Sequence, residues 1–131
     1  MKRTGLLLCV ALLMMSCASP IVRDAGLDKF APRAERSLSA GIRAYEEGAY
    51  ESAARLLQNA LSAGLLLNSD KVAAHKYLAF IHCAHAREAS CREEFRKALA
   101  LDPDLELTPA ESGHPAWAPV FKSLKHTVTK S

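Results

Sequence analysis

The chain has 131 residues, of which 50% are hydrophobic and 24% are charged, a balance that suits one small globular domain with additional segments. Aromatic residues make up only 6% while Ala and Leu are abundant, so the composition favours an all-α fold. The net charge of +3 gives no indication of nucleic-acid binding. Glycine-rich phosphate loops, GxSxG and HExxH motifs are all missing, so we expect no enzyme.

The N-terminus has the pattern of an export signal. Lys2 and Arg3 precede an uncharged apolar run over residues 5–15, which is shorter than the about 20 residues that span a bilayer but fits a signal peptide. Ser16 and Cys17 then resemble a lipobox, in which the cysteine receives diacylglycerol and the chain is cut before it. An ordinary signal peptide or an uncleaved anchor is the alternative. We predict a lipoprotein signal peptide over residues 1–16 and lipidation of Cys17.

A lipidated Cys17 would fix the location of the mature chain. Ala18 and Ser19 follow it, and an aspartate that resembles the inner-membrane retention signal is missing there. We therefore expect the periplasmic face of the outer membrane, with firm anchoring by acyl chains. Residues 17–31 lack sustained periodicity and are interpreted as the lipidated cysteine and a flexible tether.

Cysteine usage supports an oxidising compartment. Cys9 would leave with the signal peptide and Cys17 would be acylated, so that Cys83 and Cys91 remain as an even pair. A disulfide between these two is the leading interpretation. Two unpaired cysteines buried in helix faces are the alternative, because Cys is common in protein cores.

Apolar residues at three- and four-residue spacing predict four helices, over residues 32–47, 50–63, 70–85 and 89–101. Their sequences resemble two tetratricopeptide repeats, in which small residues at the eighth and twentieth positions let paired helices approach closely. The two registers are offset by 38 residues, and the marked positions are Gly41, Ala53, Leu57 and Ala60, then Ala79, Cys91, Phe95 and Ala98. Asn68, Ser69 and Asp70 are candidate N-caps of the third helix.

The C-terminal part predicts a cap on the second repeat. Thr108 and Glu111 have the spacing of a capping box. An apolar stripe follows with i, i+3, i+4, i+7 spacing, on a helix that begins at Ala116 or Trp117. The stripe consists of Trp117, Val120, Phe121 and Leu124. We thus predict one TPR-like helical domain over residues 32–126 and a frayed tail over residues 127–131.

The first helix of each repeat is expected to line a concave groove. By position in the repeat, an apolar and aromatic surface with one cation would face this groove, a suitable receptor for a peptide or helix. The predicted groove residues are Leu38, Ile42, Tyr45, Lys76, Tyr77 and Phe80. The alternatives are that the tether or the C-terminal segment fills the groove, or that these residues belong to the core.

Histidines lie close in sequence to the two remaining cysteines. Cys and His are ligands that zinc prefers, but His82 and Cys83 are adjacent on a predicted helix and point about 100° apart. This spacing suits a chelate poorly. We expect no metal and no cofactor.

Three segments resemble a narrower family: YLAFIHC (77–83), CREEFRKALALDP (91–103) and GHPAWAPVF (113–121). They are similar to tetratricopeptide-fold lipoproteins associated with type VI secretion, sometimes called TssQ. The resemblance implies a non-catalytic scaffold or adaptor that binds a protein component of an envelope secretion complex. The alternative function is a pilotin-like assembly factor for a secretin or pilus complex, which gene neighbourhood would distinguish.

Overall fold

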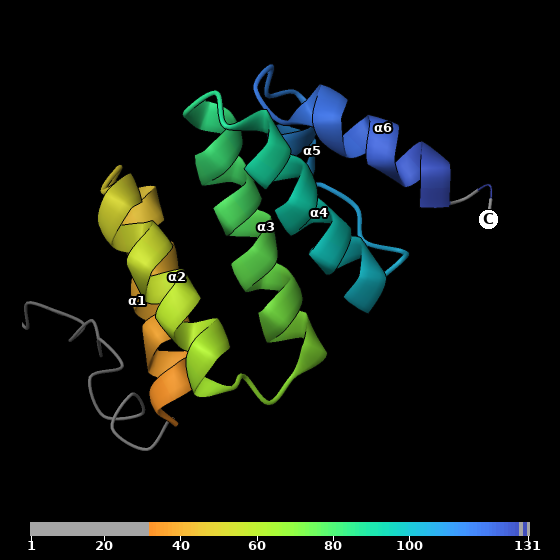
Figure 1. Cartoon of the computed structure of the whole chain (residues 1–131). Coiled ribbons are helices and arrows are strands. Elements are labelled where there is room, and N and C mark those ends of the chain that lie inside the picture. The colour runs from red at the N-terminus through yellow and green to blue at the C-terminus, as the bar shows by residue number, and fades with distance from the viewer. Residues whose placement is uncertain (1–31, 129, 131) are drawn as a thin grey trace, which may run out of the picture.

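A computed structural model describes residues 32–128 and 130 of the chain. The predicted signal peptide, Cys17 and the tether of residues 18–31 lie outside the described residues. Within the described part the fold is all-α, as the composition predicts, and the helices pack in antiparallel pairs (Figure 1). The helices are α1 (Arg33–Glu46), α2 (Tyr50–Ala63), α3 (Asn68–Ala84), α4 (Glu88–Leu101), α5 (Pro109–Ser112) and α6 (Ala118–Val128).

The first hairpin, α1 with α2, is held together by a close helix–helix approach. A Cβ atom added to Gly41 would lie 2.9 Å from Cγ of Leu57, so no larger residue fits at this crossing without a shift of Leu57. Ala53, Leu57 and Ala60 on the facing side of α2 are completely buried. The predicted first repeat is therefore confirmed.

The second hairpin, α3 with α4, repeats this arrangement. Ala79 on α3 is fully buried, and so are Cys91, Phe95 and Ala98 on α4. The two hairpins stack because α3 packs against α1 and α2. The result is a two-repeat TPR-like array with two core clusters, one that joins α1 and α2 to α3 and one that joins α3 and α4 to α6.

The turns inside the two hairpins have equivalent geometry. Gly48 and Ala86 each follow the C-cap residue of the first helix, with φ of 78° and 56°. In the first turn the Gly48 N–H donates to Tyr45 O and the Ala49 N–H to Ala44 O, the pattern of a Schellman motif. In the second turn the equivalent left-handed position, which favours glycine, is occupied by Ala86.

The link between the hairpins differs from the prediction. Helix α3 begins at Asn68, its N-cap is Leu67, and no side chain caps its first turn. The N-cap prediction for Asn68, Ser69 and Asp70 was therefore wrong. The backbone of Leu67 is extended, with φ of −89° and ψ of 138°, so residues 68–70 already lie inside the helix and cannot occupy the N-cap position.

The C-terminal segment caps the second hairpin, as predicted. Trp117, Val120, Phe121 and Leu124 are buried in one cluster with the core residues of α3 and α4. Helix α6 extends to Val128, which corrects the predicted start of a frayed tail at Thr127. The hydroxyl of Thr127 donates to Leu124 O at 2.6 Å and so extends the last turn.

Among the described residues no helix combines the length and the apolar character needed to cross a bilayer.

Candidate protein-interaction surface

The predicted groove lies between α1 and α3, and part of it belongs to the core. Leu38 is 7% exposed and Phe80 is 1% exposed. Leu38 packs in the core of the first hairpin and Phe80 in that of the second. The expectation that these two side chains line an open groove is corrected, because both are buried beneath neighbouring residues.

Two tyrosines of the predicted groove remain partly exposed. Tyr45 at the end of α1 and Tyr77 on α3 contact each other with ring centroids 5.0 Å apart. Tyr50, at the start of α2, extends this contact at 5.5 Å from Tyr45 and is 38% exposed. We call Tyr45, Tyr50 and Tyr77 the tyrosine row. Ile42 lies on the same helix as Tyr45 and is also partly buried.

Two members of the tyrosine row, Tyr45 and Tyr77, have a raised pKa. Burial raises the pKa of Tyr45 to about 12, and neighbouring tyrosines and Glu111 add to this effect. Burial, together with Glu111, also raises the pKa of Tyr77. The phenols of Tyr45 and Tyr77 are therefore neutral donors and acceptors next to an apolar ring, a combination that is common in protein interfaces.

Lys76 was predicted as the cation of the groove, and its charge is used inside the domain. Its Nζ atom donates to Oε1 of Glu111 at 2.8 Å and lies over the rings of Tyr77 and Phe80, at 5.3 and 5.7 Å from their centroids. The Lys76 side chain is 16% exposed. It consequently fixes the cap instead of offering an unpaired charge to a partner.

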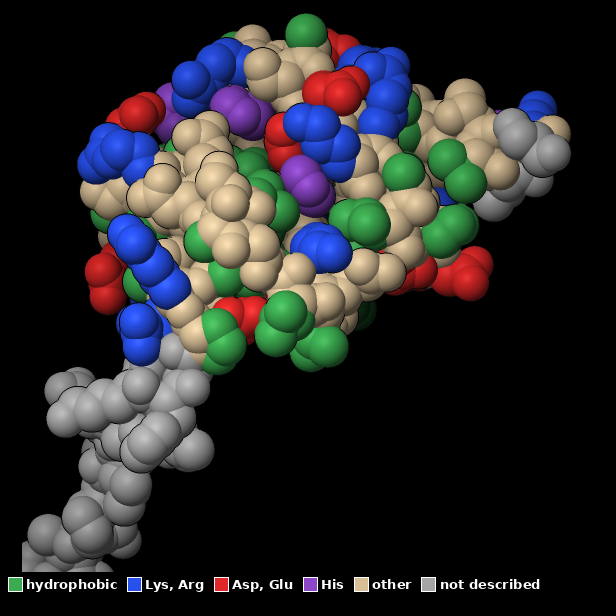
Figure 2. Space-filling model, turned by 60° about the horizontal axis from the view of Figure 1, so that its bottom comes forward, with side chains coloured by type: hydrophobic (Ala, Val, Ile, Leu, Met, Phe, Trp, Pro, Cys, Tyr) green, Lys and Arg blue, Asp and Glu red, His purple; other side chains and the backbone are tan. Residues whose placement is uncertain are grey.

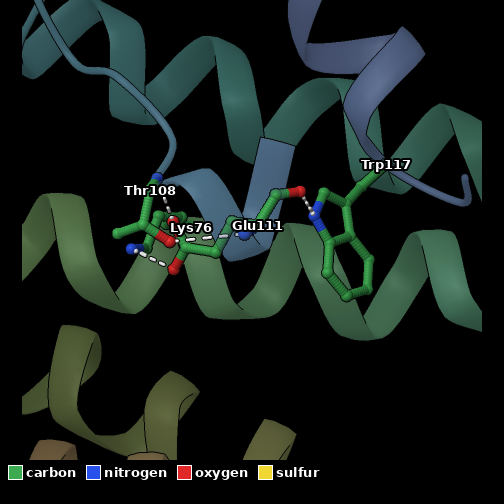
Figure 3. Close-up of polar contacts among 4 residues, drawn as sticks. All are labelled: Lys76, Thr108, Glu111 and Trp117. Atoms are coloured by element: carbon green, nitrogen blue, oxygen red, sulfur yellow. Dashed lines mark hydrogen bonds and ion pairs between the residues drawn. The ribbon is translucent and has the colours of Figure 1, made fainter. Parts of the chain in front are cut away.

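Glu111 lies at the centre of the contacts that attach the cap (Figure 3). Its second carboxylate oxygen accepts from the Thr108 N–H at 2.9 Å, and its carbonyl accepts from Nε1 of Trp117 at 2.9 Å. Burial alone would raise the pKa of the Glu111 carboxyl, but the hydrogen bonds from Lys76 and Thr108 outweigh burial and lower the pKa. The predicted capping box of Thr108 and Glu111 is confirmed.

Trp117 completes the attachment by stacking. The centroid of its ring lies 4.4 Å from that of Phe80, with 26° between the ring planes, and 3.4 Å from that of His114, with 3° between the planes. The C-terminal segment therefore covers the Phe80 side of the predicted groove, which is one of the alternatives left open above. What remains accessible between the hairpins is the tyrosine row with Ile42.

Cys83 and Cys91 form a disulfide in the structure, with Cα atoms 5.2 Å apart. The bridge joins the last turn of α3 to the first turn of α4, beside the left-handed turn at Ala86. The bridge thus fixes the second hairpin at its turn. The tyrosine row lies at the same end, since the ring centroids of Tyr50 and His85, a residue of this turn, are 5.9 Å apart.

Two of the three histidines near this disulfide, His75 and His85, have protein partners, whereas Nδ1 of His82 is buried without a hydrogen bond. Nδ1 of His75 lies 2.6 Å from Oε2 of Glu94, and Nδ1 of His85 lies 2.8 Å from Ile81 O. In the described part of the chain no three His, Cys, Asp or Glu side chains are grouped so that they would hold a metal ion.

A hollow that sequence reasoning missed lies between α6 and the segment that precedes it. Its volume is about 770 Å³, and its walls include Leu107, His114, Pro115, Phe121 and Lys122. The prolines of GHPAWAPVF shape this wall, but the sequence gives no sign of a hollow because residues about 15 apart must meet to form it.

The fold and the exposed tyrosines define a TPR-like helical repeat protein with a short stack and a built-in cap. Comparisons with protein-family models, curated proteins and solved structures find no match to this chain. Its function is therefore argued from its own residues.

Proposed function

We propose that the chain is a non-catalytic, lipid-anchored adaptor that faces the periplasm and binds a protein component of a type VI secretion system in the cell envelope. The tyrosine row with Ile42 is the binding surface in this proposal. The single observation that supports it is that Tyr45, Tyr50 and Tyr77 stay partly exposed between the hairpins while the adjacent Phe80 and Lys76 are covered by the chain's own cap.

Membrane attachment in this proposal depends on the N-terminal pattern. Residues 1–16 would be removed and Cys17 lipidated, which places the domain on the periplasmic side of the outer membrane. The Cys83–Cys91 disulfide supports this compartment, since disulfides persist in oxidising environments such as the periplasm.

The tyrosine row suits an extended or helical protein segment. Tyrosine supplies a large apolar contact with few rotatable bonds, so its ordering on binding costs little conformational entropy. The hydroxyl of each ring can also donate or accept a hydrogen bond at the rim of the contact. The assignment to type VI secretion comes from the resemblance of residues 77–83, 91–103 and 113–121.

A site-specific crosslinking experiment tests both the surface and the partner. A photoreactive phenylalanine derivative replaces Tyr77 in cells with an active type VI secretion system, and Gln58, exposed on the opposite helix α2, is replaced in the matched control. We expect Tyr77 to yield a product with an envelope component of the secretion system and Gln58 to yield none. A product with a secretin or pilus protein would instead favour the pilotin-like alternative.

The anchor is tested separately. Cys17→Ala should abolish metabolic labelling with a fatty acid and release a periplasmic form, while the Tyr77 crosslink weakens as the local concentration at the membrane falls. Continued labelling of the Cys17→Ala variant would contradict the anchor. A missing crosslink at Tyr77 in the lipidated protein would contradict the surface.

A further inference from the structure

We infer that the loop between α2 and α3 is a membrane-contacting loop, in which Leu66 and Leu67 enter the surface of the bilayer that holds the lipid anchor. This inference rests on the proposed lipidation of Cys17. Leu66 is 75% exposed and Leu67 is 61% exposed, the two highest values among the large hydrophobic side chains of the described residues.

The loop holds the two leucines outward by its own geometry. Gly64 ends α2 with a φ of 91°, and Leu65 then turns into the core. The Leu66 N–H donates to Oε1 of Glu35 at 3.3 Å, which ties the loop to the first turn of α1. Since Leu65 is fixed inside and Leu66 is fixed at its backbone, Leu66 and Leu67 protrude into solvent.

The residue choice in this loop goes against local helix stability. Leu67 occupies the N-cap position of α3 with no side-chain hydrogen bond to the helix, although Ser, Thr, Asp and Asn are strongly preferred there. Asn68, Ser69 and Asp70 follow directly, and residues 64–69 carry no charge. A local rule broken at an exposed position indicates a functional reason, and burial of apolar side chains in a bilayer provides one.

A bilayer is the surface that this loop would contact, because the predicted lipid anchor joins the domain at the same end. The start of α1 and the α2–α3 loop lie at the same end of the molecule (Figure 1). Figure 2 brings this end forward and shows hydrophobic side chains protruding at its rim, with Lys and Arg side chains nearby. Arg33 and Arg36 in the first turn of α1 are exposed, and anionic lipid headgroups attract such side chains.

Chain length brings this end of the domain to the membrane. Fourteen residues (18–31) separate Cys17 from Pro32, and a chain of this length reaches at most about 50 Å even when fully extended. Such a short connection gives the loop a high effective concentration at the lipid surface. A bilayer, and not a second protein, is therefore the occupant that the position of the anchor favours.

Depth-dependent fluorescence quenching tests the inference. The full chain is expressed with its leader, purified in mild detergent and reconstituted into vesicles of phosphatidylethanolamine and phosphatidylglycerol, with or without brominated acyl chains, which quench tryptophan on contact. Leu67→Trp places a reporter in the loop. Tyr50→Trp is the matched control, since Tyr50 is 38% exposed and is the first residue of α2, whereas the loop follows the last residue of α2.

The emission that residue 67 adds is the difference between the Leu67→Trp variant and the unaltered protein. We expect brominated lipid to lower this difference by about twofold or more, because the added side chain lies at the boundary of the acyl region. The emission of the unaltered protein should change little, because Trp117, the single native tryptophan, is 7% exposed. The emission of Tyr50→Trp should also change little, because the start of α2 lies away from the loop. In the unaltered protein, hydrogen exchange of residues 65–69 should also slow on reconstitution, which checks the result without any substitution.

Flotation of the vesicles separates the possible failures. If the protein floats with the vesicles but Leu67→Trp is quenched no more than Tyr50→Trp, the loop inference is overturned and the anchor stands. If the unaltered protein does not float, both the anchor and the loop inference fail. If the Cys17→Ala form of Leu67→Trp already has a blue-shifted emission without vesicles, residues 18–31 cover the loop, and the inference is also overturned.

Discussion

Lys76 and Glu111 are 35 residues apart in the sequence, yet Nζ of Lys76 lies 2.8 Å from Oε1 of Glu111. This ion pair joins the first helix of the second repeat to the capping box of α5. It therefore decides which part of the concave face stays open. The cap occupies the Lys76 and Phe80 side, while Tyr45, Tyr50 and Tyr77 remain accessible.

The first prediction concerns stability in acid. Burial alone would raise the pKa of Glu94, but hydrogen bonds from His75 and Lys97 lower it below the ordinary 4.5, and Glu111 behaves in the same way. A lowered carboxyl pKa stabilises the folded state fully above pH 4.5, and this contribution is lost as the pH falls through the folded-state pKa. We expect the free energy of unfolding in urea to fall steeply below about pH 4.5.

His82 adds a second effect at higher pH. Burial lowers its pKa from 6.5, so the neutral ring is favoured in the folded state. That contribution is complete above pH 6.5 and is lost below it.

The acid limb, which is the fall in unfolding free energy below about pH 4.5, is tested by two variants. Glu111→Gln should flatten the acid limb, whereas Glu93→Gln, at a carboxyl that is 55% exposed, should leave it unchanged. An identical acid limb in the Glu111→Gln variant would contradict the assignment.

The second prediction concerns the stacked cap. Trp117→Ala removes the ring that lies 4.4 Å from Phe80 and should lower the free energy of unfolding by about 3–5 kcal/mol, as for other large buried aromatic residues. Trp117→Phe keeps the stacking but loses the hydrogen bond to Glu111 O, and should cost about 1–2 kcal/mol. Urea unfolding followed by circular dichroism measures both. A loss below about 1 kcal/mol in Trp117→Ala would show that the cap is not part of the cooperative unit.

The fold was predictable because its key contacts follow the repeat register. Gly41 and Leu57 are 16 residues apart on neighbouring helices, and the small residue at the crossing shows directly in the sequence. Ala79 and Cys91 mark the second crossing in the same way. Local spacing sufficed here because the helices of a repeat pack on their immediate neighbours.

The open part of the surface was not predictable in the same way. Periodicity places Phe80 and Lys76 on one face of α3, but it does not say whether a distant segment covers that face. Glu111 and Trp117 reach them only after the chain has passed through α4 and a turn. The exposed loop at Leu66 and Leu67 was missed for a related reason. The polar residues that follow are typical N-caps, so nothing in the sequence indicated that Leu67 occupies this position.

The third prediction uses the equivalent turns of the two hairpins. Gly48→Ala should destabilise the protein by about 1 kcal/mol, because its φ of 78° is unfavourable for a side chain. Ala86→Gly relieves the same strain in the second turn and should stabilise by up to about 1 kcal/mol. Nothing lies within 4 Å of a Cβ added to Gly48, so the first effect is conformational and not steric.

Gly113→Ala is the matched control for these turn variants, since Gly113 has a φ of −91° and open space around it. Its free energy of unfolding should equal or slightly exceed that of the unaltered protein. If Ala86→Gly is less stable than the unaltered protein, the backbone strain at Ala86 does not limit the stability of this turn.

The last prediction concerns the disulfide between Cys83 and Cys91, which closes a loop with a sequence separation of 8. A bridge over so short a loop restricts the unfolded chain only modestly, so its removal should lower the free energy of unfolding by about 2–3 kcal/mol. Adding reductant to the unaltered protein should produce this loss, whereas the C83A/C91A variant should not respond to reductant. Because the bridge joins α3 to α4 next to His85, which contacts Tyr50, reduction should also weaken the Tyr77 crosslink to its partner. Non-reducing mass spectrometry of periplasmic material checks the bridge itself, and free thiols at these two positions would contradict it. A loss of unfolding free energy of equal size on reduction of the C83A/C91A variant would show that the loss has another cause.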